Sequence, residues 1–230
     1  DVTEGEWVRL RLYNTVGHTN WVVYDSSDTF VREARWKQES SRSALVSIRL
    51  AAEPRLWGYR VEQEPGKLTL ILRRPPEPAA TLLPMAGLVI VLDPGHSPGK
   101  EEGAVGPTGR REAEANMAIA LELKRMLEEK GATVVLTRQG DAVVDLPDRP
   151  RRAWETRGDL FLSVHNNALP DGSNPFAAPR GFTVFYYHPH ALGLARHMHA
   201  AYRRLSPLAD EGLRPDLLAR ARDHRHDARR

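Results

Sequence analysis

Leu88-Val89-Ile90-Val91-Leu92-Asp93-Pro94-Gly95-His96 is the stretch of sequence that decides the fold. Its first five residues form a continuous apolar run, which is typical of a strand buried on both faces of a sheet. Residues 112–130 follow with a helical pattern that ends at Gly131. A buried strand that leads into a helix is the repeating unit of an α/β protein, so this region predicts a sheet covered by helices.

The same alternation of strands and helices continues along the chain. Short runs of β-branched and aromatic residues predict three more strands, and an apolar stripe at helical spacing predicts one more helix. The strands are expected at residues 133–137, 160–164 and 182–187, and the helix at 191–205. We therefore expect residues 87–230 to form an α/β domain with a central mixed sheet flanked by helices.

The first third of the chain has a different pattern. Apolar and polar residues partly alternate at 7–13, 44–50 and 67–72, which predicts strands, and no long helical stripe is present. Residues 1–76 are therefore expected to form a small all-β domain. Residues 77–86 begin in a charged, proline-rich stretch and are expected to form an extended linker.

Composition limits the classes of protein to consider. The 230 residues are 41 % hydrophobic, carry a net charge of +3 and include no Cys, which excludes disulfides, thiolate metal sites and Cys nucleophiles. No basic cluster interleaved with aromatic residues indicates nucleic-acid binding, and no apolar run is long enough to span a membrane. The excess of Arg is spread along the chain, which is typical of an ordinary surface or of mild attraction to anionic polymers.

Two histidines directly follow predicted strands. His96 ends the stretch quoted above, and His165 follows the strand at 160–164. Functional groups of open α/β sheets collect past the carboxyl ends of the strands, so the two imidazoles are expected to converge. Imidazole is a common zinc ligand, and the pair therefore indicates a metal site. Each His taken alone is also consistent with a polar loop residue.

A third candidate ligand lies at the start of the helix predicted at 112–130. Glu112, Asn116, Ile119 and Leu123 share one helical face, which must meet the sheet because it carries the apolar residues. Glu114 points away from that face, so we expect Glu112 to be the ligand. The alternative is that Glu112 only complements the positive end of the helix dipole. A His, Glu, His set with one open position is the pattern of a catalytic zinc site.

Four segments of the chain also occur, in this order, in a known family. They are Asp93-Pro94-Gly95-His96, Glu112 with Asn116-Met117-Ala118-Ile119-Ala120, Leu136-Thr137-Arg138 with Asp141 and Arg149, and Leu162-Ser163-Val164-His165-Asn166-Asn167-Ala168. With these segments, residues 88–220 resemble the zinc-dependent N-acetylmuramoyl-L-alanine amidases, which cleave peptidoglycan between N-acetylmuramic acid and L-alanine. By this resemblance, His96, Glu112 and His165 are the ligands of a Zn²⁺ ion.

The resemblance implies an enzyme that hydrolyses this amide bond, with zinc as cofactor and peptidoglycan as substrate. It places the protein in the periplasm or the extracellular cell envelope and leaves room for a regulatory protein partner. The chain begins at Asp1 rather than Met, so we expect its natural start, with any signal peptide, to have been removed. The position of the all-β domain at 1–76 resembles that of the wall-targeting domains that precede some amidases.

The sequence departs from the family in three respects. Ala113 stands where the family often has a basic residue, and Asn166 stands where it usually has Ala. The family's catalytic Glu lies on a late strand in a Glu-x-Gly-Phe-like motif, and this sequence contains no such motif. We therefore expect the last strand to be missing from this chain, no catalytic residue to be identified in it, and zinc to be bound with little or no turnover. The alternative is an inactive wall-binding or regulatory fragment that holds zinc.

The residues around the ligands leave alternatives open. Asp93 is a candidate to orient the imidazole of His96 from outside the ligand set, or it is a turn residue that bonds only backbone. Asn166 and Asn167 are candidates to bind the substrate peptide, or they cap the loop. A metal site on an α/β sheet also suits a peptidase or a deacetylase, and the ordered motifs favour the amidase.

The other histidines and the tryptophans have simpler interpretations. Five histidines are expected on loops or on the surface, with a role on the substrate side as the alternative for two of them, His188 and His190. The other three are His18, His197 and His199, and adventitious metal binding is the most that is expected of His224 and His226. Trp7, Trp21, Trp36 and Trp57 either pack in the core of the all-β domain or form a face that stacks on sugars.

Overall fold

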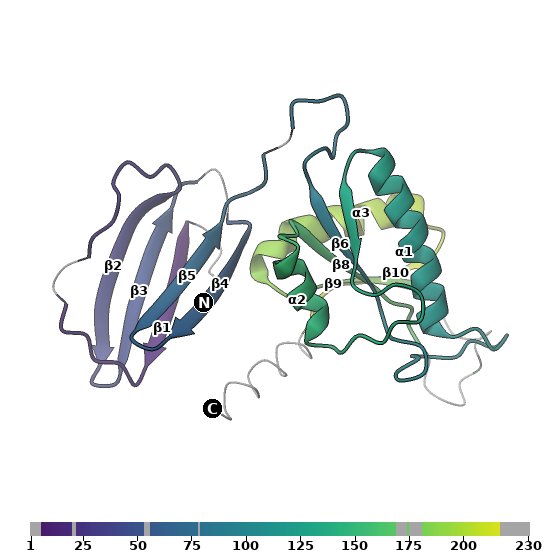
Figure 1. Cartoon of the computed structure of the whole chain (residues 1–230), viewed down its shortest axis with the longest axis horizontal. Helices are drawn as coiled ribbons and strands as arrows, with labels where there is room; N and C mark the ends of the chain where they lie inside the picture. Colours follow the sequence, from purple (N-terminus) through teal and green to yellow (C-terminus); the bar gives the residue numbers. More distant parts are fainter. Residues whose placement is uncertain are drawn as a thin grey trace. The chain divides into compact units, whose positions relative to one another are not determined.

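The chain forms two compact units (Figure 1). One consists of Pro76–Pro179, and the other of Asp1–Pro75 together with Arg180–Arg230. The computed structural model describes residues 6–19, 22–52, 56–77, 79–168, 174 and 181–216. The domain boundaries predicted at residues 77 and 87 stay predictions.

The unit Pro76–Pro179 is built on a parallel three-stranded sheet. Strands β6 (Val89–Pro94), β7 (Thr133–Leu136) and β8 (Leu160–Val164) lie in the order β7-β6-β8. The apolar run of β6 is buried as predicted, with Ile90, Val91 and Leu92 at most 2 % exposed. Burial on both faces explains why this strand shows no alternation of apolar and polar residues.

Helix α1 (Glu112–Glu129) packs against this sheet with a stripe that differs in part from the predicted one. Ile119 was expected on the buried face but is 47 % exposed, whereas Ala120 and Asn116 are fully buried. The small side chain of Ala120 lets the helix approach the sheet closely, and the buried stripe is thereby turned away from Ile119. Leu127 completes the stripe in the core beside Ile90 and Leu92. Glu112 remains on the buried face, as predicted.

Helix α2 (Asp148–Glu155) was not predicted. Its sequence is mostly charged and contains Pro150, which argues against a helix unless the proline lies in the first turn, as it does here. Arg149 is the buried residue of this helix.

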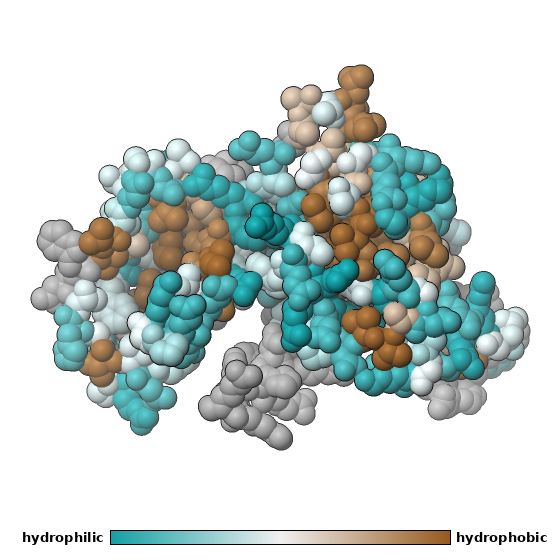
Figure 2. Space-filling view, viewed as in Figure 1, coloured by the Kyte–Doolittle hydropathy of each residue, from teal (hydrophilic) through white to brown (hydrophobic). Residues whose placement is uncertain are grey.

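The segment before β6 is anchored to the end of α1. The backbone N–H of Met85 donates to the carbonyl of Lys130 at 2.9 Å, and Met85 packs against the core that contains Ile90. Gly131, which ends the helix as predicted, has a φ of 93° that favours glycine. Figure 2 shows apolar atoms, in brown, at the tip of this segment, where Leu82 and Leu83 are 102 % and 49 % exposed.

The described residues between 6 and 77 contain strands and no helix, which confirms the prediction of an all-β region. Strands β1 (Trp7–Tyr13), β2 (Val31–Ser40) and β3 (Ser43–Leu50) pair antiparallel in the order β1-β3-β2, and β4 (Gly58–Glu64) pairs with β5 (Lys67–Arg73). Strands β2 and β4 were not predicted, because their sequences are largely polar.

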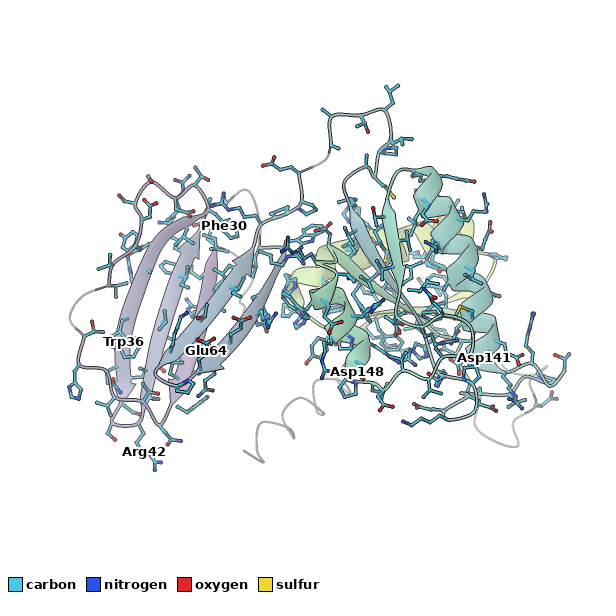
Figure 3. The ribbon with its side chains drawn as sticks, in the orientation of Figure 1. Phe30, Trp36, Arg42, Glu64, Asp141 and Asp148 are labelled. Carbon is cyan, nitrogen blue, oxygen red and sulfur yellow. The ribbon has the colours of Figure 1, made fainter. Side chains whose placement is uncertain are left out.

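The core of this region lies between β5 and the three-stranded sheet. Val8, Phe30 and Leu50 are buried there, and Leu70 and Leu72 of β5 pack against them. Figure 3 labels Phe30 just before β2 and Trp36 along that strand.

The rest of the described chain contains strand β9 (Gly181–Tyr186), a short 3₁₀ turn η1 (Pro189–Ala191), helix α3 (Leu192–Leu205) and strand β10 (Ala209–Pro215). β9 and β10 pair parallel, and α3 packs on them through Ala195. β9 and α3 follow the predicted strand and helix closely. β10 was not predicted because it is polar and contains a glycine. The tail at 223–230 lies outside the described residues.

Candidate metal centre

His96, Glu112 and His165 lie together at the carboxyl edge of the parallel sheet. Nε2 of His96 lies 3.2 Å from Oε2 of Glu112, and Nδ1 of His165 lies 3.3 Å from Oε1 of the same carboxylate. One donor atom from each of the three lies within 4.8 Å of the others. The two imidazole rings meet edge to face, with centroids 4.9 Å apart. The structure therefore brings together the three residues that the sequence singled out.

The backbone of His96 adopts an uncommon conformation. Its φ is 64°, in the left-handed region that side chains other than glycine rarely occupy. Its carbonyl accepts a hydrogen bond of 2.8 Å from Nη2 of Arg149. Strained residues of this kind persist only where the surroundings hold them, so Arg149 is placed to fix the turn that presents His96.

The carboxylate of Glu112 is held by backbone amides from two loops. Oε2 accepts from the N–H of Ala104 at 3.0 Å, and Oε1 accepts from the N–H of Asn166 at 2.9 Å. Burial raises the pKa of Glu112, but these two hydrogen bonds and the nearby His96 outweigh it, so the pKa lies below its ordinary value. The side chain is therefore an anion at neutral pH, as a metal ligand must be.

Two glycines leave the space that the ligands fill. A Cβ on Gly95 would lie 2.3 Å from Cε1 of His165. A Cβ on Gly103, whose φ is 73°, would lie 2.6 Å from both Oε2 of Glu112 and Cδ2 of His96. Any larger residue at either position would push a ligand out of place.

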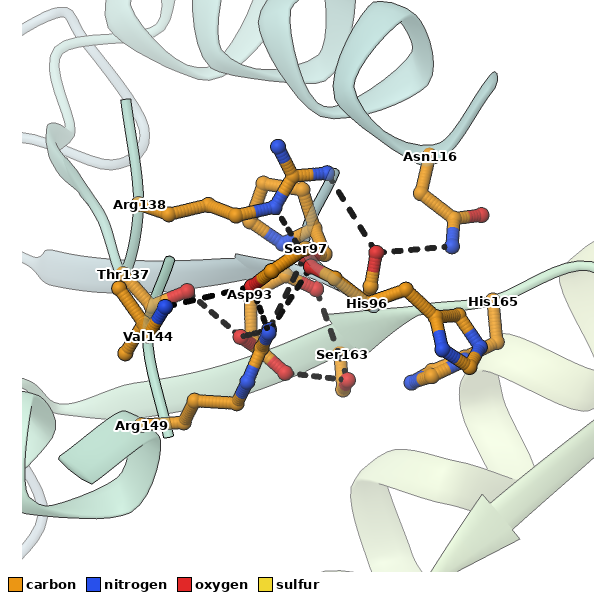
Figure 4. A network of polar contacts seen from close by, with 12 residues as sticks. Asp93, His96, Ser97, Asn116, Thr137, Arg138, Val144, Arg149, Ser163 and His165 are labelled. Atoms are coloured by element: carbon orange, nitrogen blue, oxygen red, sulfur yellow. Dashed lines mark hydrogen bonds and ion pairs between the residues drawn. The ribbon is translucent and has the colours of Figure 1, made fainter. Parts of the chain in front are cut away.

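Two buried arginines hold the turn from Asp93 to Ser97 (Figure 4). Arg138 donates from Nε to the carbonyl of Pro94 at 3.0 Å and from Nη2 to that of Ala113 at 2.6 Å. Arg149 donates to Oδ1 of Asp93 at 2.8 Å and to the hydroxyl of Ser97 at 3.0 Å. Burial and then the charge of Arg149 lower the pKa of Arg138, whereas Asp93 opposes this effect. Asp93 is thus the counter-charge that lets two cations lie under the ligand turn.

Asp93 reaches His96 through Arg149. Its Oδ1 also accepts from the hydroxyl of Thr137 at 2.5 Å, and its Oδ2 accepts from that of Ser163 at 2.7 Å. We expected Asp93 either to contact the imidazole of His96 or to bond only backbone. Instead, its carboxylate is surrounded by side chains from β8, from α2 and from the residue that follows β7. The reason is that Asp93 still belongs to β6, so its side chain points among the neighbouring strand ends rather than along the turn.

Asn116 links all three ligand-bearing segments. It is fully buried on α1, one turn after Glu112, and its Nδ2 lies 3.2 Å from the carbonyl of Gly95 and 3.5 Å from Oε1 of Glu112. Its Oδ1 accepts a 2.7 Å hydrogen bond from Nδ2 of Asn166, the residue after His165. Asn166 thus reaches the inner side of the site through its amide, although both Asn166 and Asn167 are exposed residues. Substrate binding by these two residues stays a prediction.

Sequence reasoning assigned no role to Thr137, Arg138, Arg149 or Asn116, although each stood in a segment that carried the family resemblance. A signal existed for Thr137 and Arg138, because they follow strand β7 and so reach the same sheet edge as His96. For Arg149 there was none, since the helix that carries it was not predicted.

The remaining histidines lie in other places. His188 and His190 stack on each other with centroids 5.0 Å apart, His197 contacts the carbonyl of Gly193, and His199 pairs with Asp210 at 2.7 Å. Among the described residues, the single group with metal-ligand spacing is His96, Glu112 and His165. His18 is exposed, and His224 and His226 lie outside the described residues.

The tryptophans do not share one face. Trp36 is aligned with Val46 and Trp7 with Arg49, and these two positions of β3 face opposite sides of the sheet. Trp57 precedes β4, and Trp21 lies outside the described residues.

The geometry of the three donors fits a metal ion. For bonds of about 2.1 Å in a tetrahedral site, neighbouring ligand atoms lie roughly 3.4 Å apart. The two imidazoles lie 3.2 and 3.3 Å from different oxygens of Glu112, and one donor atom from each of the three residues lies within 4.8 Å of the others, so small side-chain shifts would bring the donors to this spacing. Two imidazoles and one carboxylate are a ligand set that zinc accepts while keeping a position open. The same features favour a hydrolytic metal centre on an α/β fold.

The chain belongs to the N-acetylmuramoyl-L-alanine amidase family. Residues 90–228, which are more than half of the chain, match that family and include all three candidate ligands. The predicted family is thereby confirmed.

Relatives and solved structures agree with this assignment. LytH of Staphylococcus aureus, described as a probable cell wall amidase, is 38 % identical over 135 residues, which are 58 % of this chain and 43 % of that protein. The match therefore spans less than half the length of that relative. The N-acetylmuramoyl-L-alanine amidase AmiC2 of Nostoc punctiforme is 30 % identical, with a TM-score of 0.51 over 57 % of this chain and 70 % of that one.

A second solved structure gives the same result. The catalytic domain of the amidase CwlV from Bacillus (Paenibacillus) polymyxa var. colistinus is 32 % identical, with a TM-score of 0.50 over 56 % of this chain and 69 % of that one. These likenesses confirm the predicted α/β fold class. In the described part of the chain, no helix has the length and apolar character needed to cross a membrane.

Proposed function

We propose that this protein hydrolyses the amide bond between N-acetylmuramic acid and L-alanine in peptidoglycan, with zinc held by His96, Glu112 and His165. The observation that carries the proposal is the convergence of these three side chains at the sheet edge of a chain from this family. When bound, zinc supplies Lewis-acid chemistry, because it acidifies a water molecule and polarises the amide carbonyl.

The exposure of the three ligands indicates the side from which substrate approaches. The side chain of Glu112 is 6 % exposed, that of His96 19 % and that of His165 50 %. Glu112 and His96 therefore form the floor of the site, and His165 forms its solvent-facing side. The backbone amides of Ala104 and Asn166 hold the Glu112 carboxylate in place and leave each oxygen a lone pair that faces the imidazoles.

Proton transfer to the leaving amine needs a further group. Among the described residues, the ligand cluster gathers one carboxylate, Glu112, whose two oxygens are already engaged. The absence of a general acid–base typically lowers the rate by ~10²–10⁴-fold. We therefore infer that the polypeptide of this sequence binds zinc but turns over slowly or not at all.

Location and targeting follow from the proposed substrate. Peptidoglycan lies outside the cytoplasmic membrane, so we infer that the protein acts in the periplasm or the extracellular cell envelope. The all-β domain at 1–76 then serves to hold the enzyme on the wall, with 77–86 as the connection to the amidase domain.

Digestion of purified peptidoglycan tests the proposal. The zinc-loaded protein is incubated with the polymer, and soluble products are identified by mass spectrometry. Release of stem peptides with free L-alanine N-termini is the expected product, at a low rate, and it is lost on chelation and in His165→Ala. The matched control is His197→Ala, which removes an exposed imidazole from α3 and leaves the ligand group intact.

Two other outcomes would contradict the proposal, one about the bond that is cut and the other about turnover. Products cut within the peptide or at acetyl groups would indicate a peptidase or a deacetylase. A folded protein that holds one zinc and releases nothing at high enzyme concentration would show that this polypeptide is a metal-holding fragment without turnover.

A further inference from the structure

The loop that leaves His96 runs back past the metal ligands to the start of helix α1. Within this loop, Glu102, Gly103 and Ala104 form a short segment that we call the strap. A Cβ on Gly103 would lie 2.6 Å from Cδ2 of His96 and 2.6 Å from Oε2 of Glu112, so the strap lies directly against both ligands. The position of the strap therefore affects how these two side chains face each other.

The strap caps helix α1 in place of a side chain. Arg111, the residue before the helix, makes no capping hydrogen bond with its side chain. Instead, the N–H of Glu112 donates to the carbonyl of Ala104 at 2.8 Å, and the N–H of Ala113 donates to that of Glu102 at 3.0 Å. Amides at the start of a helix have no partner within it, and the strap satisfies two of them here.

The strap also holds the ligand carboxylate. The N–H of Ala104 donates to Oε2 of Glu112 at 3.0 Å, and the carbonyl of Ala104 accepts from the backbone N–H of the same glutamate. Glu112 is thus bound to Ala104 through both its backbone and its side chain. A shift of the strap would therefore move the carboxylate as well as the first turn of the helix.

The side chain of Glu102 ties the strap to the segments on either side of it. Its Oε1 accepts a hydrogen bond of 3.1 Å from the N–H of Gly99, three residues after His96, and it pairs with Nη1 of Arg111, next to Glu112. One carboxylate oxygen thus joins the turn that leaves one ligand to the residue that precedes another. In the described part of the chain, this side chain makes no hydrogen bond to either ligand, so it acts on them through the backbone that it holds.

We propose that Glu102 is a positioning residue for the metal centre, which holds the strap so that His96 and Glu112 keep the arrangement that a zinc ion needs. This inference rests on the proposed zinc site and adds to it a residue outside the ligand set. The hydrogen bond to Gly99 carries most of the effect. The ion pair with Arg111 contributes less, because the two side chains are 30 % and 47 % exposed and exposed ion pairs stabilise proteins little.

Calorimetric zinc titration of the full chain tests the proposal. Glu102→Ala removes the acceptor for the N–H of Gly99 and is expected to lower zinc affinity by ~10–100-fold. Glu102→Gln keeps an acceptor oxygen and removes only the charge, so its affinity is expected to stay within ~3-fold of that of the unmodified protein. Equal affinity of Glu102→Ala and the unmodified protein would overturn the proposal.

The matched control removes the same charge one residue earlier. Glu101 is exposed, and among the described residues it bonds through its backbone, which donates to and accepts from Ser97. Glu101→Ala is expected to leave zinc affinity within ~2-fold of that of the unmodified protein. Equal weakening by Glu101→Ala and Glu102→Ala would overturn the proposal, because it would show an effect of net charge near the site.

A spectrum separates positioning of the ligands from a general loss of stability. Co²⁺ is bound in place of zinc, and its visible absorption depends on the geometry of its ligands. At saturating Co²⁺, Glu102→Ala is expected to change the shape and intensity of the spectrum, whereas Glu102→Gln and Glu101→Ala are expected to match the unmodified protein. A lower thermal midpoint with an unchanged saturated spectrum would show a merely structural role and overturn the proposal.

Hydrogen exchange in the metal-free protein keeps this inference separate from the proposed function. By NMR, the N–H groups of Ala104 and Glu112 are expected to exchange at least ~5-fold faster in Glu102→Ala than in Glu101→Ala, because the strap that pairs them is released. Unchanged exchange would overturn the role of Glu102 even in a protein that binds zinc. If the unmodified protein bound no zinc and the exchange effect remained, the proposed zinc site would be contradicted and the hold of Glu102 on the strap would stand.

Discussion

Asn166 donates a 2.7 Å hydrogen bond from its side chain to Oδ1 of the buried Asn116, and this contact joins the loop of His165 to helix α1. On the other side, Asn116 donates to the carbonyl of Gly95, the residue before His96. A single amide therefore sets the distance between the segments that carry the two imidazoles. Loss of a residue that orients metal ligands from outside typically lowers metal affinity by ~10–100-fold.

A double-mutant cycle on this pair measures how strongly the segments are coupled. Asn116→Ala and Asn166→Ala are each expected to lower zinc affinity by ~10–100-fold. Because the two residues share a hydrogen bond, their effects on the free energy of unfolding are expected to be non-additive by ~0.5–3 kcal/mol in urea denaturation. Asn167→Ala, at the exposed neighbouring position, is the control, and strict additivity of the pair would contradict the coupling.

Arg149 is expected to be needed both for the fold and for metal binding. Arg149→Gln leaves Asp93 buried without its cation, and loss of one partner of a buried pair costs ~3–5 kcal/mol of unfolding free energy. Arg149→Lys keeps the charge but not the fork that spans Asp93 and the carbonyl of His96, so zinc affinity is expected to fall even where the protein folds. Denaturation and calorimetric zinc titration measure the two effects.

The control for Arg149 lies on the same helix. Arg151 is 63 % exposed and pairs with Asp148, so Arg151→Lys is expected to change the unfolding free energy by no more than ~0.5 kcal/mol. Wild-type zinc affinity in a folded Arg149→Lys protein would show that Arg149 does not position His96.

Gly95→Ala is expected to abolish tight zinc binding while the protein still folds. The new methyl group would overlap the ring of His165, and the ring, with half of its surface exposed, can move away into solvent. Gly106→Ala is the matched control, because its Cβ meets its nearest atom at an ordinary 3.5 Å. Calorimetric zinc titration and circular dichroism check both variants. Retention of tight zinc binding by Gly95→Ala would show that the close approach is not required.

The metal-free protein is expected to lose stability at acid pH through Glu112. Its pKa in the fold lies below its ordinary value, so the folded state favours the anion. This contribution is present above the unfolded pKa of ~4.3 and is lost as the pH falls through the lower folded value. Between pH 7 and pH 3, the urea midpoint of the metal-free Glu112→Gln variant is expected to fall less steeply than that of the unmodified metal-free protein. Identical slopes would exclude a contribution from this carboxylate.

The three ligands could be predicted from the sequence because two strong patterns, the ends of buried strands and helical spacing, point to them. Buried strands ending at His96 and His165 place both at one sheet edge, and helical spacing places Glu112 on the inner face of α1. Ile119 was misplaced on that face because spacing alone does not measure how closely a helix approaches a sheet, and Ala120 brings it closer. The long-range bonds of Arg149 to Asp93 and His96 depend on tertiary folding, which no local pattern encodes.

The alternation of apolar and polar residues also failed to predict the strands whose sequences are largely polar. β2 and β4 lie at sheet edges or on a solvated face, so their side chains need not be apolar, and β10 contains a glycine and three charged residues.

The placement of the three ligands sets an order in which the metal centre can be completed during synthesis. His96 and Glu112 leave the ribosome early, but His165 and the amide of Asn166 arrive only after β7 and α2, and β8 must join β6 before they reach Glu112. A nascent chain therefore cannot bring all three ligands together until the parallel sheet has formed. Metal binding by all three ligands then indicates that the unit containing β6, β7 and β8 has folded.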